Sequence, residues 1–533
     1  MTRSAAWQVL LIFGLICLQA EWSTPHDNEA HYLTKARHYW NPTWCADDMF
    51  LQSADAHLVF YWTLGWLTLW LPLPVLAWIG RFASWLLIAY GLQRIGRNVF
   101  GPSTWYIVAA AGLFLLLLNR FDLAGEWIIG GFEAKLIAYG FAFLAISSLL
   151  ENRWRIVFIW LGLASMFHVL VGGWMLLAVA MAWLLTRRKP TIVQLLPYAV
   201  VALVLSLAGL IPALTLGGGV PAEQKVLAYG IYTYQRLPHH LVFSRIWDVN
   251  SAKVLWHGAL VLVWVFLQFV AWRDVLQRQI SKLVIAAIAF ALVGITIDTL
   301  AEWESNRQQS AASSSFFSDL AFHTLRFYWF RLSDVMVPLG TSFALLGWSH
   351  RTKGPRFLQV VTVAIVLIAV ANHVVEIRVQ RLRDPRPASC RRMIRVAEPR
   401  ELLLHHFREW KAVCRWIRRE TPSDSVWLTP RLQQTFKWYA GRAEVVNWKD
   451  TPQDAKTLLQ WHQRISDVFK PDDQWYYGLS THTSDQLLAV AKKYDAQFVL
   501  VDRDNFYQYR REVKNAKLVE RFRNEFYTVY EVK

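Results

Sequence analysis

The sequence predicts a polytopic α-helical membrane protein with a soluble α/β domain at its C-terminal end. Of the 533 residues, 55% are hydrophobic and only 18% are charged, which is too apolar for two or three water-soluble domains. Apolar stretches near the roughly 20 residues that cross a bilayer recur along residues 1–376. From about Glu398, amphipathic patterns replace these stretches, which predicts a change of domain.

The apolar runs give the expected membrane spans. They are Trp7–Ala20, Pro74–Leu92, Trp105–Leu118, Ala134–Leu150, Ile156–Leu170, Trp174–Leu185, Ile192–Leu214, Val254–Trp272, Leu283–Ile297, Phe327–Trp348 and Leu358–Ala371. We therefore expect about 11 transmembrane helices. The first run also fits a cleaved signal peptide, because Arg3, an apolar core and Leu18-Gln19-Ala20 form its three-part pattern.

Basic residues predict the orientation of these spans, because short loops rich in Lys and Arg stay in the cytoplasm. All the basic clusters fall on one side of the predicted spans: Arg94/Arg97, Arg153/Arg155, Arg187–Lys189, Arg273/Arg278/Lys282 and Arg351/Lys353/Arg356. The loops that hold most of the carboxylates are expected to face outward: 21–57, 119–133, 215–252 and 298–325. The C-terminal domain is then expected outside the cytoplasm.

The C-terminal part alternates amphipathic and β-like segments. The expected helices are Glu401–Arg419, Arg431–Ala440, Pro452–Arg464 and Ser484–Lys493, and the expected strands are Val426–Thr429, Val445–Trp448, Phe498–Asp502 and a final hairpin that includes Phe526–Val532. This pattern predicts a small α/β domain. The expected division is a membrane domain at 1–376, an Arg-rich linker at 377–397 and the α/β domain at 398–533, with a supporting or recognition role for the last.

The first outer loop, 21–57, carries two groups of carboxylates. A carboxylate near the membrane surface can act as a general base on an acceptor hydroxyl or help to bind a divalent cation. Glu29, Asp27 and Asp48 are therefore candidate catalytic residues, and Asp47 and Asp48 are candidate ligands of Mg²⁺ or Mn²⁺. The alternative is that these are solvated loop acids that cap helices.

The same loop resembles the start of the GT-C glycosyltransferases, which include protein O-mannosyltransferases and the aminoarabinose transferases of lipid A. The resemblance is carried by the acidic group Asp27-Asn28-Glu29 followed by Tyr32, Ala36 and the Pro42/Trp44 element, by Gly130-Gly131-Phe132-Glu133-Ala134-Lys135, and by Phe167-His168 with Val171-Gly172-Gly173. The chain departs from the family at Asn28, where the protein-glycosylating members have an Asp base. The opening is also similar to that of a bacterial membrane family with no assured activity.

The resemblance implies a GT-C-like fold in a bacterial inner membrane and a sugar donor carried on polyprenyl phosphate. A phosphate at the membrane surface needs cationic hydrogen-bond donors. The candidates in outward segments are Lys135, Arg236, His239, His240 and Arg326. Lys135 also fits a snorkelling interfacial lysine. Arg331 with Asp334, three residues apart on one helix, fits a buried pair, and His168 fits a hydrogen-bonded core residue.

The first functional hypothesis is thus an inverting membrane glycosyltransferase that moves a sugar from polyprenyl phosphate to an unknown extracytoplasmic acceptor. The expected partners are membrane lipid, the lipid-linked donor and that acceptor. The net charge of +17 is spread over loop clusters, which argues against nucleic acid. A secondary transporter would also explain many spans, although no related halves are seen. A non-catalytic membrane scaffold that displays the α/β domain is the third hypothesis.

Overall fold

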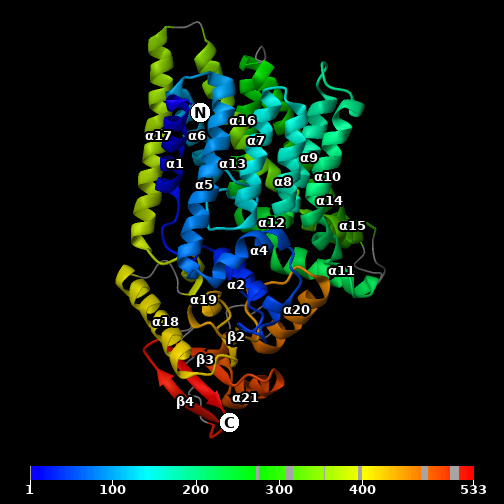
Figure 1. Ribbon diagram of the computed structural model, residues 1–533. Coiled ribbons are helices and arrows are strands. Elements are labelled where there is room, and N and C mark those ends of the chain that lie inside the picture. Colours follow the sequence, from blue (N-terminus) through cyan, green and yellow to red (C-terminus); the bar gives the residue numbers. More distant parts are fainter. Residues whose placement is uncertain are drawn as a thin grey trace.

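Figure 1 shows the computed structural model of the chain, which describes residues 2–271, 275–307, 316–352, 355–393, 399–469, 478–503 and 515–533. A bundle of long helices forms one end of the molecule, and the C-terminal helices and strands form the other (Figure 1). Short helices from the loops lie between these two parts (Figure 1). The candidate functional site lies where this middle layer meets the other two parts.

The bundle contains the helices that correspond to the apolar runs. They are α1 (Arg3–Gln19), α5 (Leu73–Phe100), α6 (Thr104–Arg120), α7 (Ala134–Leu150), α8 (Trp154–Phe167), α9 (Val169–Leu184), α10 (Ile192–Thr215), α13 (Phe243–Ala271), α14 (Val275–Arg307), α16 (Arg331–Arg351) and α17 (Arg356–Arg383). Among the described residues, 5 helices are long and apolar enough to cross a membrane, namely α5, α10, α13, α14 and α17. The prediction of a helical membrane protein is confirmed in this coarse form, and the count of about 11 spans stays a prediction.

Helix α5 illustrates how the sequence determines the ends and the packing of a helix in the bundle. The helix has Pro74 in its first turn, where the missing N–H needs no intrahelical partner. It ends at Gly101, whose φ of 61° is rarely adopted by residues with a Cβ. In between, the ring of Phe132 packs so closely on Gly80 that a Cβ at Gly80 would collide with it. This contact holds the segment before α7 against α5.

The C-terminal part contains a five-stranded sheet in the order β2-β1-β3-β5-β4. Strand β1 (Val426–Leu428) runs parallel to β2 (Ala443–Glu444) and β3 (Phe498–Asp502), whereas β5 (Tyr527–Val532) is antiparallel to β3 and β4 (Leu518–Arg523). The predicted strand Phe498–Asp502 is confirmed. The predicted strand Val445–Trp448 is wrong, because pairing with β1 occurs at Ala443 and Glu444.

Three amphipathic helices accompany this sheet: α18 (Arg400–Glu420), α20 (Ala455–Phe469) and α21 (Ser484–Lys493). All three agree with the predicted helices to within a few residues. Helix α18 buries Trp410, Val413 and Ile417 on one face, at the spacing expected of an amphipathic helix. The fourth predicted helix shortens to α19 (Phe436–Ala440), because the preceding Gln433 and Gln434 point inward and bond to Tyr527 and to the Ser389 carbonyl.

The middle layer is built from the first outer loop and the loop after α10. The first supplies α2 (Glu29–Trp40), α3 (Met49–Gln52) and α4 (Leu58–Leu64), and the second supplies α11 (Ala222–Gly230), the π-helix η2 (Ile231–Arg236) and α12 (Pro238–Leu241). Backbone groups join this layer to the C-terminal part. The N–H of Ala455 donates to the Leu216 carbonyl at 2.8 Å, and the N–H of Ala54 donates to Asp454 at 3.2 Å.

Candidate functional site

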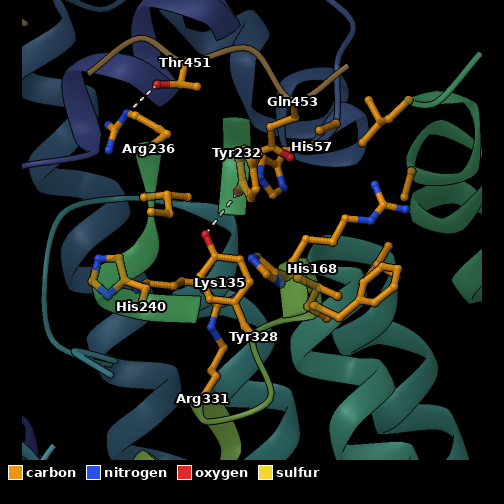
Figure 2. Close-up of a pocket in the computed structure, with 18 of the residues that line it drawn as sticks. His57, Lys135, His168, Tyr232, Arg236, His240, Tyr328, Arg331, Thr451 and Gln453 are labelled. Atoms are coloured by element: carbon orange, nitrogen blue, oxygen red, sulfur yellow. Dashed lines mark hydrogen bonds between the residues drawn. The ribbon is translucent and has the colours of Figure 1, made fainter. Parts of the chain in front are cut away.

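A cavity of about 620 Å³ lies where the bundle, the middle layer and the C-terminal part meet. Residues from distant parts of the sequence line it, in the segments 28–57, 124–135, 168–170, 210–240, 326–331 and 449–458. Figure 2 shows Lys135, Arg236, His240, Arg331, Tyr232 and Tyr328 around this space. The volume is suited to a ligand of the size of a phosphorylated sugar or larger.

Basic side chains outnumber acidic ones in the wall of the cavity. Among the described residues, six Lys or Arg side chains line it against two Glu: Lys135, Lys225, Arg236, Arg326, Arg331 and Lys449 against Glu126 and Glu133. Converging cations in a cavity partly screened from water attract an anionic ligand. The arrangement is therefore suited to a phosphate or another multiply charged oxyanion.

Glu126 lies between two of these cations. Its Oε1 is 3.6 Å from Nζ of Lys135, and its Oε2 is 2.9 Å from Nε of Arg331. Lys135 also lies over the ring of Trp127, 3.3 Å from the centroid. The predicted pairing of Arg331 with Asp334 is therefore wrong, because Arg331 pairs with Glu126 instead.

Asp334 anchors the loop that carries Glu126. Its carboxylate accepts backbone N–H groups from Leu123 at 2.6 Å and from Ala124 and Glu126 at 3.0 Å each. The carbonyl of Ala124 in turn lies 2.5 Å from Nδ1 of His240, which must be the donor of this hydrogen bond. Asp334 thus positions two parts of the cavity wall without lining the cavity itself.

Arg236 joins the middle layer to the C-terminal part. Its Nε donates to Oγ1 of Thr451 at 2.7 Å and to the carbonyl of Trp448 at 3.1 Å, as Figure 2 shows for Thr451. The residue ends the π-helix Ile231–Arg236, an irregular turn of a kind that is frequent at functional sites. The same turn presents Tyr232, whose hydroxyl meets that of Tyr328 at 3.1 Å.

Tyr328 has an unusual backbone conformation. Its φ of 59° and ψ of 56° place a bulky residue in the left-handed region, which costs on the order of 1 kcal/mol. Arg331 lies over its ring, with the guanidinium carbon 4.0 Å from the centroid. Arg326, from the same segment, lies 3.7 Å over the ring of Tyr229. The aromatic rings thus fix the planes of two guanidinium groups at the cavity.

A row of rings follows another part of the wall. The ring centroids of His31 and Tyr32 are 5.8 Å apart, those of Tyr32 and His57 are 4.9 Å apart, and those of His57 and His168 are 5.3 Å apart. His168 interrupts the path from α8 to α9, and its Nδ1 accepts the N–H of Val171 at 3.3 Å. The proton of a neutral His168 is therefore on Nε2, which makes that atom a hydrogen-bond donor.

Next to this row lies a buried cluster of charges centred on Lys437. Nζ of Lys437 is 2.6 Å from Glu444, 2.6 Å from Asp450 and 3.1 Å from Asp48. Nδ1 of His31 lies 3.2 Å from the other oxygen of Asp450. The cluster ties α2 and the N-terminus of α3 to α19 and to the loop after β2.

The cluster shifts the pKa values of its members. Burial by itself lowers the pKa of Lys437, but Asp450, Asp48 and Glu444 raise it well above its ordinary value. Burial raises the pKa of Glu444 to about 7 against the opposing effect of Lys437. Burial would also raise the pKa of Asp450, but Lys437 and His31 outweigh it and lower that pKa. Asp450 is therefore more firmly ionised than Glu444.

The structure brings together four of the five predicted phosphate-binding residues. Lys135, Arg236, His240 and Arg326 all line the cavity. Their role in binding a phosphate stays a prediction. His239 does not line it. Its side chain is exposed, and its ring centroid lies 4.2 Å from that of His240 with the two planes tilted by 47°. His31, Glu126 and Lys449 also line the cavity, and sequence reasoning missed them because their spacing matches no known motif.

Glu29, the first candidate for the catalytic base, has a different environment. It is fully buried and outside the cavity wall. Its oxygens lie 2.8 Å from Nε and 2.5 Å from Nη2 of Arg81, and they accept the N–H groups of Phe132 at 2.8 Å and His26 at 2.9 Å. This geometry is that of a structural ion pair. Asp27 is half-buried and likewise does not line the cavity.

Asp47 and Asp48 do not fit a metal site in this arrangement. Asp47 is exposed, whereas Asp48 is buried and both of its oxygens are engaged. Oδ1 accepts the N–H of Leu51, and Oδ2 accepts the N–H of Glu444 and pairs with Lys437. Within the described ranges, no group of three or more His, Cys, Asp or Glu side chains is placed to hold a metal ion.

A segment of the C-terminal part matches a protein-family model. Residues 408–468 match a domain of unknown function (DUF6798). No curated protein matches the chain. The matched segment contains Lys437, Glu444 and Asp450 of the charge cluster, and Thr451 of the cavity wall.

Proposed function

We propose that the protein is a membrane glycosyltransferase that moves a sugar from a polyprenyl-phosphate carrier to an acceptor on the side of the membrane where the C-terminal part lies. The observation that carries the proposal is the surplus of Lys and Arg side chains in a cavity at the end of an apolar helix bundle. A lipid-linked sugar phosphate combines an apolar chain with an anionic group at the membrane surface. The apolar helix bundle is suited to the chain, and the basic side chains of the cavity are suited to the anionic group.

The apolar side of the cavity supports this reading. Leu210, Ala213 and Leu214 of α10 line it, and α10 is one of the helices long enough to cross a membrane. Most of the large apolar side chains of α10 are exposed, as expected of a helix that faces lipid. A prenyl chain lying along α10 would bring its phosphate to the basic part of the wall.

The basic residues have distinct roles in the proposed reaction. Lys135 and Arg331 share Glu126 and keep a net positive charge at the centre of the wall. They would neutralise the phosphate as it leaves the anomeric carbon, which is where negative charge develops in the transition state. Arg236 and Arg326, which lie against aromatic rings, would orient the same group.

The experiment measures sugar transfer in membranes that contain the full chain. Polyprenyl phosphates carrying radiolabelled mannose, glucose, galactose or arabinose serve as donors, and the label that enters other lipids, proteins or polysaccharides is counted. We expect transfer by the wild type and a loss of at least about 10-fold in Lys135→Met and Arg236→Ala, because each removes a charge-assisted hydrogen-bond donor.

Arg245→Ala is the matched control, because Arg245 is exposed, lies outside the cavity wall and pairs on its own helix with Asp248 at 3.5 Å. It should transfer sugar at the wild-type rate. Transfer that persists in both cavity variants, or that is absent with every donor, would contradict the proposal and favour the transporter or the scaffold. Protein levels in the membranes are compared in parallel.

A further inference from the structure

We propose that His31, oriented by Asp450, is the general base that removes the proton of the acceptor hydroxyl. This inference rests on the transfer reaction proposed above and assigns a catalytic residue to it. His31 lies in α2 and lines the cavity, and Asp450 reaches it from the loop after β2. The dyad therefore exists only where the first outer loop meets the C-terminal part.

The hydrogen bond to Asp450 sets the tautomer of His31. A carboxylate only accepts, so Nδ1 of His31 must carry the proton in the contact of 3.2 Å. The other ring nitrogen, Nε2, is then the basic atom of the neutral imidazole. The hydrogen bond of the His31 ring in the described part of the chain is made by Nδ1 and not by Nε2. A carboxylate that fixes the tautomer and stabilises the imidazolium is the arrangement used by His general bases.

The surroundings keep His31 in the form that can accept a proton. Burial lowers the pKa of His31, and Lys449 and Lys35 lower it further, against the opposing effect of Asp450. His57 also lies near this ring and interacts with it electrostatically. Asp450 itself is held by Lys437 at 2.6 Å, which fixes the carboxylate that orients the base. The ring of His31 packs on Phe50, with centroids 4.2 Å apart, so its plane is fixed as well.

The carboxylates near the cavity are less suited to this role. Glu126 lies between Lys135 and Arg331, and each of its two oxygens is paired with one of these cations. Glu133 lines the cavity, but its two oxygens accept hydrogen bonds from Asn28 at 3.1 Å and from Trp127 at 3.2 Å. Glu29 is outside the wall. In contrast to these three carboxylates, His31 is a base that a separate carboxylate, that of Asp450, orients.

The step is a direct displacement at the anomeric carbon. The acceptor oxygen forms a bond to this carbon as the bond from the carbon to the phosphate oxygen breaks. The acceptor proton moves to Nε2 of His31, and the electron pair of the broken bond leaves with the polyprenyl phosphate. The proton of the imidazolium is later released to water, which returns His31 to its starting form.

His31→Asn is the sharpest test. The Asn amide can still donate to Asp450, as Nδ1 does, but it has no atom in the place of Nε2. We expect kcat for sugar transfer to fall by about 10²–10⁴-fold, while binding of undecaprenyl monophosphate to the purified full chain changes less than about 3-fold. The acidic limb of the pH profile of kcat/KM should also disappear.

His405→Asn is the matched control, because His405 likewise pairs with a carboxylate, Glu525 at 2.6 Å, but lies on α18 away from the cavity. It should leave kcat unchanged. Transfer by the wild type that His31→Asn retains would overturn the assignment while the proposed function stands. The same applies if Glu133→Gln, and not His31→Asn, abolishes kcat. If the wild type neither transfers sugar nor binds undecaprenyl monophosphate, the proposed function fails and the base role fails with it.

Discussion

Replacing Lys437 by Met should weaken the junction between the first outer loop and the C-terminal part. Lys437 is the single Lys or Arg paired with Asp48, Glu444 and Asp450 among the described residues, and all four side chains are at most 2% exposed. Methionine has a similar length but no charge, so three buried carboxylates would lose their cation. Breaking a buried ion pair in this way costs about 3–5 kcal/mol.

The loss should depend on pH. Near pH 8 Glu444 of the wild type, with a pKa of about 7, is mainly ionised beside Lys437. In the variant this buried carboxylate must either stay charged without its cation or take up a proton, and both cost more at pH 8 than at pH 5. Near pH 5 it is protonated, and fewer negative charges remain uncompensated. We therefore expect the full loss at pH 8 and a smaller one at pH 5. A loss of about 3 kcal/mol lowers the unfolding midpoint by roughly 6–12 °C for a unit of 150–250 residues.

The assay is thermal unfolding of the purified full chain in detergent, followed by tryptophan fluorescence, with limited proteolysis as a second readout. Lys492→Met is the control, because Lys492 is an exposed residue in the last turn of α21. A Lys437→Met variant as stable as this control at pH 8 would refute the reasoning. The double variant with Glu444→Gln should recover part of the loss, since it removes one of the uncompensated charges.

Three further variants test other buried groups. Arg81→Met should destabilise the chain by about 3–5 kcal/mol in the same unfolding assay, because Glu29 is then buried without its cation. Asp334→Asn should cost about 1.5–3 kcal/mol, because the amide cannot accept all three backbone N–H groups, and hydrogen exchange of residues 123–126 should rise. Glu444→Gln should reduce the pH dependence of stability. The folded pKa of Glu444 is raised to about 7, so its contribution is present below the unfolded value near 4.5 and is lost as the pH rises to 7. Unfolding midpoints between pH 5 and 8 should fall less in the variant than in the wild type.

The helices were the most predictable part of the fold. Runs such as Ala134–Leu150 and Ile192–Leu214 are apolar along their length, so their α-helical state follows from the sequence. The number of membrane crossings does not follow, because α8 and α9 are short and are separated only by His168. The strand predicted at Val445–Trp448 was misplaced because only the two residues of β2, Ala443 and Glu444, pair with β1.

The site was predictable only in part. Lys135 and Arg236 could be singled out because cations at the ends of apolar runs are suited to a phosphate at the membrane surface. The ion-pair partner of Arg331 could not be predicted. Helical spacing points to Asp334, and only the tertiary fold brings Glu126 close to Arg331. The pairing of His31 with Asp450 spans 419 positions of the sequence and leaves no local pattern.

The cavity wall comes from segments that are far apart in the sequence, and this affects how the protein is assembled during synthesis. Ribosomal synthesis delivers the bundle and the middle layer before residues 449–458, and one wall of the cavity is therefore missing until that segment arrives. During this interval the basic groups around Lys135 are open to solvent. We expect these groups to bind an anion tightly only after the last part of the chain docks through the hydrogen bond between Arg236 and Thr451. A nascent chain would thus lack the complete cavity until its own assembly is complete.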